Sequence, residues 1–200
     1  MRIAIDLNDV IRDYTNAFIK NYKKAFPNVP DVDEIEITSP NFFDIFPFTN
    51  EHAYHQFIYE DYPLEIYGHA DAMEKDLPAR FNDWMFKTLR NIDVDDVIDV
   101  AFVSPMEYEL SIQSTYFFLS KIGSRVREVI FPKDSFSIWN NCDVLITANP
   151  KLINSKPDCE NQKTCIKIST TYNQEDIADY TYDSLMEFIG DENNILNLLE

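Results

Sequence analysis

The chain opens with a strand-like segment, residues 2–7, in which a short apolar run leads directly to a carboxylate. Residues 3–5 form an unbroken apolar run with β-branched side chains, which is typical of a buried central strand in a parallel sheet. Asp6 follows this run, and Asn8 stands two residues later. A carboxylate at the end of a buried strand is costly unless another group pairs with it, and functional groups of α/β sheets gather where the strands end. The segment therefore predicts an α/β fold with a catalytic, metal-binding or relict carboxylate at Asp6.

From residue 97 onward, strand-like and helix-like segments alternate along the chain. Gly123 is expected to end the first of these helices, because glycine tolerates the left-handed conformation that follows many helices. Asp183 or Ser184 is expected to cap the last one. Such alternation implies a parallel sheet with helices on both faces and right-handed crossovers. The predicted strands cover residues 97–103, 126–131, 144–147 and 165–169, and the predicted helices cover residues 112–122 and 184–199, with a short helix around Trp139.

Residues 13–95 do not follow this alternation and are rich in acidic, aromatic and proline residues. A helix is predicted over residues 13–26, because Phe18, Tyr22 and Phe26 recur every four positions. Helical periodicity is also present in residues 50–60 and 71–91.

These patterns divide the chain into a core and an insertion. We predict one core domain built from residues 1–12 and 96–200, with residues 13–95 inserted as a mostly helical cap over the first strand. A chain of 200 residues is long enough to bury a core of this kind. The predicted fold class is a three-layer, doubly wound α/β domain with a parallel sheet.

The charge balance limits the classes of partner. The chain has 35 acidic against 17 basic residues and a formal net charge of −18. Such a surface repels polyphosphate backbones, so no nucleic acid polymer is expected as a partner, whereas a local cation could still hold a small anionic molecule. No segment approaches the ~20 apolar residues of a membrane-spanning helix, and no secretory signal is expected. Cys142, Cys159 and Cys165 lack CxxC spacing and are expected to be thiols, so the predicted location is cytoplasmic.

Polar side chains follow each of the first four predicted strands. Asp6 and Asn8 follow the first, Ser104 the second, Lys133 the third and residues 147–149 the fourth. Because the carboxyl ends of parallel strands meet at one edge of a sheet, we expect these groups to lie close together. Phosphoryl transfer through an aspartyl-phosphate needs such groups: a carboxylate attacks, a hydroxyl and an ammonium hold the phosphate, and Mg²⁺ neutralises charge.

The ordered set resembles the haloacid dehalogenase-like (HAD-like) superfamily, whose core domain is Rossmannoid. Within it, the chain looks like the 5′(3′)-deoxyribonucleotidase branch, in which a helical cap is inserted directly after the first motif. The resemblance implies a Mg²⁺-dependent phosphomonoesterase, a nucleotidase-like hydrolase acting on a small phosphorylated molecule such as a nucleoside monophosphate. It is carried by residues 3–11, 102–105 and 143–150.

The resemblance also implies roles for single residues. Asp6 corresponds to the nucleophile, and Asn8 stands at the position of the general acid/base. Phosphate contacts are implied for Ser104 and Lys133, and Arg12 could reach an anionic ligand. The implied Mg²⁺ ligands are Asp6, the backbone carbonyl of Asn8, and Asn149.

The departures from the family's pattern all weaken catalysis. The first motif of the family is Asp-x-Asp, and Asn8 replaces the second Asp with a group that cannot transfer a proton at neutral pH. Thr147 and Ala148 stand where an acidic pair completes the Mg²⁺ shell, so the metal site is expected to be weak or lost. Asp9 is close enough in sequence to substitute as a ligand. We therefore expect a phosphatase of weak activity; the alternative is a catalytically inactive homologue that binds a ligand or a partner.

Several of these residues also have a structural explanation. Ser104 is equally well explained as the N-cap of the next helix, with Glu107 completing a capping box. Lys133 is more often a solvated surface lysine than a phosphate ligand, and Arg12 could pair with a carboxylate of the cap.

Two groups of residues in the predicted insertion also have both a functional and a structural explanation. The four phenylalanines between residues 42 and 48 could form a wall that stacks on a base, or simply the packed core of the cap. His52 and His55 could share a helix face, but without an adjacent third ligand a surface helix is the better prediction than a metal site.

Overall fold

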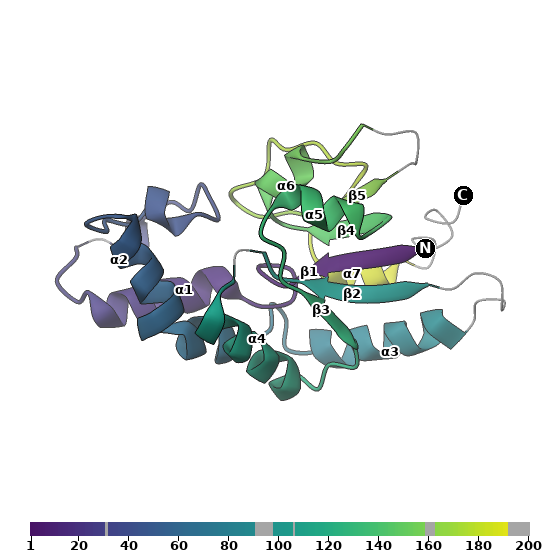
Figure 1. Cartoon of the computed structure of the whole chain (residues 1–200), viewed down its shortest axis with the longest axis horizontal. Helices are drawn as coiled ribbons and strands as arrows, with labels where there is room; N and C mark the ends of the chain where they lie inside the picture. Colours follow the sequence, from purple (N-terminus) through teal and green to yellow (C-terminus); the bar gives the residue numbers. More distant parts are fainter. Residues whose placement is uncertain (31, 91–97, 106, 159–162, 192–200) are drawn as a thin grey trace.

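The computed structural model describes residues 1–30, 32–90, 98–105, 107–158 and 163–191 of the chain. Its centre is a parallel sheet with the strand order β3-β2-β1-β4-β5-β6 (Figure 1). The order reverses between β1 and β4, and ligands of such sheets bind outside the strand ends at this reversal. The strands are β1 (Arg2–Asp6), β2 (Asp99–Val103), β3 (Glu128–Ile130), β4 (Val144–Thr147), β5 (Thr164–Ile168) and β6 (Tyr180–Tyr182).

Helices cover both faces of the sheet. They are α3 (Leu77–Arg90), α4 (Glu109–Lys121), α5 (Ser135–Asn140), α6 (Pro150–Asn154) and α7 (Leu185–Gly190). Successive strand residues point to opposite faces. Ile3 and Ile5 pack in one cluster with apolar residues of α3, α4 and α7, whereas Ala4 and Leu145 pack in another with those of α5 and α6. The sheet is therefore the middle of three layers.

The predicted fold class is confirmed: the chain forms an α/β domain with a doubly wound parallel sheet. Gly123 lies just beyond α4 with a φ of 65°, the conformation expected of a residue that ends a helix. The sequence pattern gave no sign of β6 or α6, which are three and five residues long. The last predicted helix begins as α7, capped by Ser184, and its predicted part beyond residue 191 lies outside the described residues.

Most of the inserted region forms a second, helical unit with a core of its own. Its core is aromatic: Phe18 packs against Phe42, Phe46 and Phe57. Phe42 and Phe46 are 0% and 2% exposed, and the partly buried Phe43 and Phe48 pack against the same cluster, so the four phenylalanines belong to a packed core. The elements of this unit are α1 (Tyr14–Ala25), η1 (Val32–Glu34), η2 (Phe42–Asp44), α2 (Glu51–Gln56), η3 (Phe57–Asp61) and η4 (Leu64–Gly68).

The helix α3 packs on the sheet and is not part of the helical unit, although the predicted insertion extends past this helix to residue 95. Leu77, Phe81 and Trp84 are buried in the cluster that covers the sheet, and Figure 1 shows α3 running alongside β2. The helical unit beside the sheet domain thus ends before residue 77, because the apolar stripe of α3 faces the sheet. Residues 91–95 lie outside the described residues.

Within the described residues, every helix is too short or too polar to span a membrane. Cys142 and Cys165 are buried thiols, and burial raises the pKa of each to about 11 and about 12, respectively. Cys159 lies outside the described residues.

Candidate functional site

The candidate site lies at the carboxyl edge of the sheet, where β1, β2 and β4 end. The register places Asp6 beside Val103, so Ser104 follows at the same edge. Thr147, the last residue of β4, donates a hydrogen bond from Oγ1 to Asp6 Oδ2 at 2.7 Å. The Asn8 N–H donates to Asp6 Oδ1 at 3.3 Å. Both oxygens of Asp6 therefore accept a hydrogen bond. One of the donors is Thr147, which stands where the family pattern has its acidic pair.

The carboxyl group of Asp6 is almost fully removed from solvent, with 1% of the residue exposed. Burial raises its pKa from 3.8 to about 7, although the hydrogen bonds from Thr147 and Asn8 lower it in part. The charge of Asp9 raises this pKa further, and that of Arg12 lowers it. A carboxylate nucleophile must be ionised to attack, and this raised pKa lowers the population of the ionised form near neutral pH.

The turn after β1 holds Asp9 in an unusual conformation. Asp9 has a φ of 56°, in the left-handed region that few residues other than glycine adopt. Its carboxylate accepts hydrogen bonds from the N–H and the hydroxyl of Thr15 and from the hydroxyl of Tyr172, at 2.9, 2.7 and 2.8 Å. These contacts hold the turn, and both oxygens of Asp9 are already engaged by the protein.

Arg12 lies behind this turn with its side chain fully buried. Its Nε and Nη2 donate to Asn8 Oδ1 at 3.0 and 2.5 Å. Nη2 also donates to Ser104 Oγ at 3.0 Å, and Nη1 donates to Thr115 Oγ1 at 2.5 Å and to the Tyr67 carbonyl at 3.3 Å. The guanidinium thus engages the side chain at the acid/base position and the hydroxyl at the predicted phosphate position.

Glu107 supplies the charge that balances Arg12. Its Oε1 lies 2.7 Å from Arg12 Nη2, and both side chains are fully buried. The hydroxyls of Ser104 and Thr115 both donate to the Glu107 carboxylate. The carboxylate is therefore held by one guanidinium and two hydroxyls. The sequence predicts for Glu107 only a capping role, because no local pattern links residues 12 and 107.

Ser104 does not cap α4, which corrects one of its two explanations. The helix begins at Glu109, and the N–H of Tyr108 donates to the hydroxyl of Ser111 at 2.9 Å. The predicted capping box is therefore wrong: the Ser104 hydroxyl donates to the Glu107 side chain, as part of the cluster around Arg12, and not to the backbone of α4.

The structure brings together only some of the predicted site residues. Asp6, Asn8, Arg12 and Ser104 are connected by the hydrogen bonds described above. Asn149 instead caps α6, where its Oδ1 accepts from the Lys151 N–H at 2.9 Å. Lys133 is exposed in the loop between β3 and α5. Neither has a hydrogen bond or ion pair to Asp6 in the part of the chain that the structure describes.

The donor set around Asp6 does not suit a resident Mg²⁺ ion. Mg²⁺ requires several hard oxygen ligands in octahedral geometry. The described residues contain no group of three or more His, Cys, Asp or Glu side chains that could hold a metal. The oxygens of Asp9 and the side-chain oxygen of Asn8 are engaged by protein donors, and the buried charge of Arg12 acts on Asp6. A second cation here would meet electrostatic repulsion.

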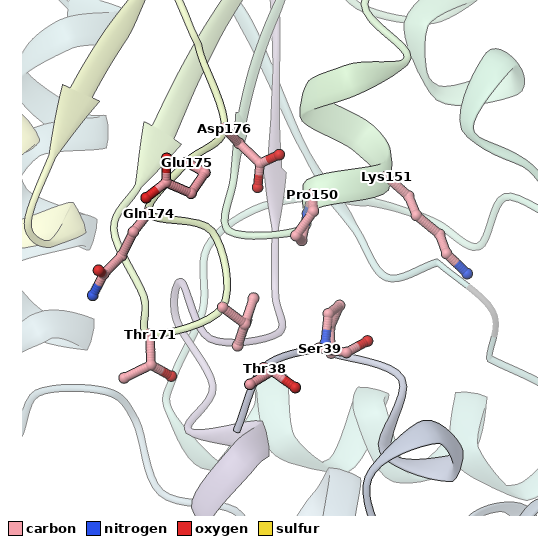
Figure 2. A pocket seen from close by; sticks show the side chains of 10 residues that line it. Thr38, Ser39, Pro150, Lys151, Thr171, Gln174, Glu175 and Asp176 are labelled. Carbon is pink, nitrogen blue, oxygen red and sulfur yellow. The ribbon is translucent and has the colours of Figure 1, made fainter. Parts of the chain in front are cut away.

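An open pocket of about 420 Å³ lies between the two units (Figure 2). Thr38, Ser39 and Pro40 line it from the helical unit. In the upper part of Figure 2, Lys151 lies to the right and Glu175 and Asp176 lie further to the left, above Thr38 and Ser39. Tyr172 also lines the pocket and donates its hydroxyl to Asp9, so the pocket adjoins the turn that follows β1. The remaining lining residues are Pro150, Thr171 and Gln174.

Comparisons with known proteins give similarity in structure alone. No protein-family model and no curated protein matches the sequence. A candidate HAD-hydrolase of Bacillus subtilis, YfnB, whose crystal structure has magnesium bound, is similar with a TM-score of 0.60 and 11% identity over 98% of both chains. A candidate haloacid dehalogenase-like hydrolase of Burkholderia xenovorans LB400 is similar with a TM-score of 0.63 and 7% identity, covering 100% of this chain and 98% of the other. The chain therefore has the fold of the HAD-like hydrolases.

Proposed function

We propose that this protein is a non-catalytic, ligand-binding protein built on the HAD-like hydrolase fold. The observation that carries the proposal is the pairing of Asn8 Oδ1 with the buried guanidinium of Arg12, whose charge Glu107 balances. The acid/base position is thus both unable to transfer a proton and fixed by two donors. Loss of a general acid or base alone slows such reactions by ~10²–10⁴-fold.

Two further features of the candidate site at the carboxyl edge of the sheet support this proposal. The hydroxyl of Ser104 is directed to the Glu107 carboxylate, so it is not available to a phosphate oxygen without rearrangement. Asp6 has a pKa of about 7 and hydrogen bonds on both oxygens. The charge stabilisation that a metal supplies is worth several kcal/mol, and the side chains here do not suit Mg²⁺.

The pocket of Figure 2 is the proposed ligand site. Its lining combines hydroxyl and amide groups with the ammonium of Lys151 and the carboxylates of Glu175 and Asp176. These groups suit a small polar molecule, and Lys151 can pair with an anionic substituent such as the phosphate of a nucleoside monophosphate. The net charge of −18 disfavours longer phosphate polymers.

Turnover and binding are tested separately. Release of inorganic phosphate from deoxynucleoside monophosphates and p-nitrophenyl phosphate is measured with excess Mg²⁺, beside an Asp6→Asn variant. We expect equal rates for the two proteins, because Asp6 is not used as a nucleophile. Turnover by the natural sequence clearly above that of the variant would overturn the proposal.

Binding is followed by thermal shift with nucleosides and nucleoside monophosphates. The phosphorylated compounds are expected to stabilise the protein, and Lys151→Ala is expected to remove their effect. Lys87→Ala is the matched control, since this exposed lysine of α3 pairs with Asp83 and is not in the pocket. Equal shifts in both variants would contradict the assignment of this pocket.

A weak phosphatase is the second candidate, favoured by one observation. Asp6 retains the position of a nucleophile at the end of β1, next to the reversal of strand order. In that case the rate would depend on Asp6 and would rise with pH through about 7 as its carboxyl group ionises. A rate that is both lost in Asp6→Asn and dependent on pH in this way would favour the phosphatase.

A further inference from the structure

The cluster around Glu107 has the composition of an oxyanion-binding site. A carboxylate lies at its centre, and its donors are the guanidinium of Arg12 and the hydroxyls of Ser104 and Thr115. All of these groups are buried: Arg12, Ser104 and Thr115 are each 0% exposed. Charge-assisted donors that converge on one anion in the protein interior are characteristic of binding sites for carboxylates and phosphates.

We propose that Arg12, Ser104 and Thr115 form an oxyanion site that the chain fills with its own Glu107 carboxylate. Ser104 and Glu107 leave the sheet in the same short loop between β2 and α4, so the carboxylate is tethered beside its hydroxyl donor. A tethered group competes at a high effective concentration. Free oxyanions are therefore excluded from the site in the natural sequence.

The donors need an anion for electrostatic reasons. Arg12 is fully buried, and a buried guanidinium without a partner is strongly destabilising. Asn8 and the Tyr67 carbonyl contact Arg12 but carry no charge. Within the described residues, Glu107 is the one carboxylate that forms an ion pair with it. Loss of this carboxylate leaves a positively charged cavity that a small anion can fill.

The cavity left by Glu107→Ala matches a specific probe. The substitution removes the terminal methylene and the carboxylate, which are the heavy atoms of acetate. Acetate can therefore restore both the volume and the charge that the variant lacks. Inorganic phosphate carries the same kind of oxygen acceptors but is bulkier, so the two anions separate a carboxylate site from a phosphoryl site.

The test is chemical rescue of thermal stability. Tm is measured for the natural sequence, Glu107→Ala, and the double variant Arg12→Met/Glu107→Ala, in acetate, phosphate or chloride at equal ionic strength and pH. Acetate at about ten times its Kd is expected to raise the Tm of Glu107→Ala by about 3–5 °C relative to chloride. The natural sequence and the double variant are expected to show no such rise, because one has the site filled and the other lacks the guanidinium.

Each outcome decides for or against the site. A rise in Tm with acetate or phosphate that occurs only in Glu107→Ala supports the site. The anion that gives the larger rise shows whether the site prefers a carboxylate or a phosphate. Equal shifts in all three proteins would show a general salt effect and overturn it. If Glu107→Ala is unfolded in chloride, recovery of native protein only in an oxyanion buffer supports the site, and failure in every buffer overturns it. The Tm measurement requires neither turnover nor a ligand in the pocket of Figure 2, so the oxyanion site and the proposed function can fail independently.

Discussion

At the end of β1, the Asp6 carboxyl group lies in the protein interior, where burial raises its pKa from 3.8 to about 7. The folded state therefore binds this proton more tightly than the unfolded state does. The contribution of Asp6 to stability is complete below its unfolded pKa and is lost as the pH rises through about 7.

Substitution of Asp6 by asparagine should remove this dependence on pH. We expect the free energy of unfolding of Asp6→Asn, relative to the natural sequence, to increase by about 2–3 kcal/mol between pH 5 and pH 8. Urea unfolding of both proteins across this range measures the difference. A constant difference would mean that Asp6 remains ionised in the folded protein throughout.

Arg12 and Glu107 should behave as a buried ion pair, in which removal of either partner alone lowers the stability of the fold. Arg12→Met leaves the Glu107 carboxylate buried without its cation, and we expect a loss of about 3–5 kcal/mol in the free energy of unfolding. The double variant Arg12→Met/Glu107→Leu removes both charges and should recover most of this loss. A double-mutant cycle in urea checks the prediction, and additive losses would contradict it.

At the scale of elements, Gly68 decides how closely η4 approaches α4. A Cβ atom at this position would lie 2.8 Å from Leu64 Cδ1 and 3.2 Å from both Phe117 Cδ1 and the Ser114 carbonyl. We expect Gly68→Ala to lower the free energy of unfolding by about 1–3 kcal/mol, because Phe117 and the Ser114 backbone of α4 must give way, whereas the Leu64 side chain of η4 can turn aside. Gly190→Ala is the control, since nothing lies within 4 Å of its Cβ position. Equal effects of the two substitutions on the unfolding midpoint would contradict this view of the contact.

Some elements could be predicted from sequence because their signals are local. Buried strands such as β1 and β4 are continuous apolar runs, and α1 has a clear apolar stripe. The three-residue β6 has no such run and is partly exposed, so its pairing with β5 comes from the fold rather than from its own sequence. The fold class could thus be predicted, whereas the edge of the sheet could not.

The candidate site shows the same limit more strongly. The positions of Asp6 and Ser104 could be predicted, because Asp6 ends one recognisable strand and Ser104 directly follows another. The pairing of Arg12 with Glu107 and Thr115 could not, since their hydrogen bonds join residues 95 and 103 positions apart. The sequence predicts an anionic ligand or a carboxylate of the cap as the partner of Arg12, whereas its partner in the structure is Glu107, in the loop after β2.

At the scale of the whole molecule, the loop after β5 makes one of the contacts between the helical unit and the sheet domain. Thr171 donates its hydroxyl to the Ile37 carbonyl at 3.0 Å, and Tyr172 donates its own to Asp9 Oδ2 at 2.8 Å. Asp9 in turn accepts from the N–H and hydroxyl of Thr15 in α1. The loop therefore holds the helical unit at two points beside the pocket of Figure 2.

Removal of one hydroxyl should loosen this connection without disturbing the core. Tyr172→Phe deletes the donor to Asp9 and leaves the ring in place, so we expect faster amide hydrogen exchange at Thr15 and in residues 169–173. Tyr182→Phe is the matched control, because it deletes a similar hydrogen bond, from Tyr182 to Asp191, elsewhere in the domain. Exchange that is unchanged in Tyr172→Phe, or equally fast in both variants, would mean that the hydroxyl of Tyr172 does not hold the two units together.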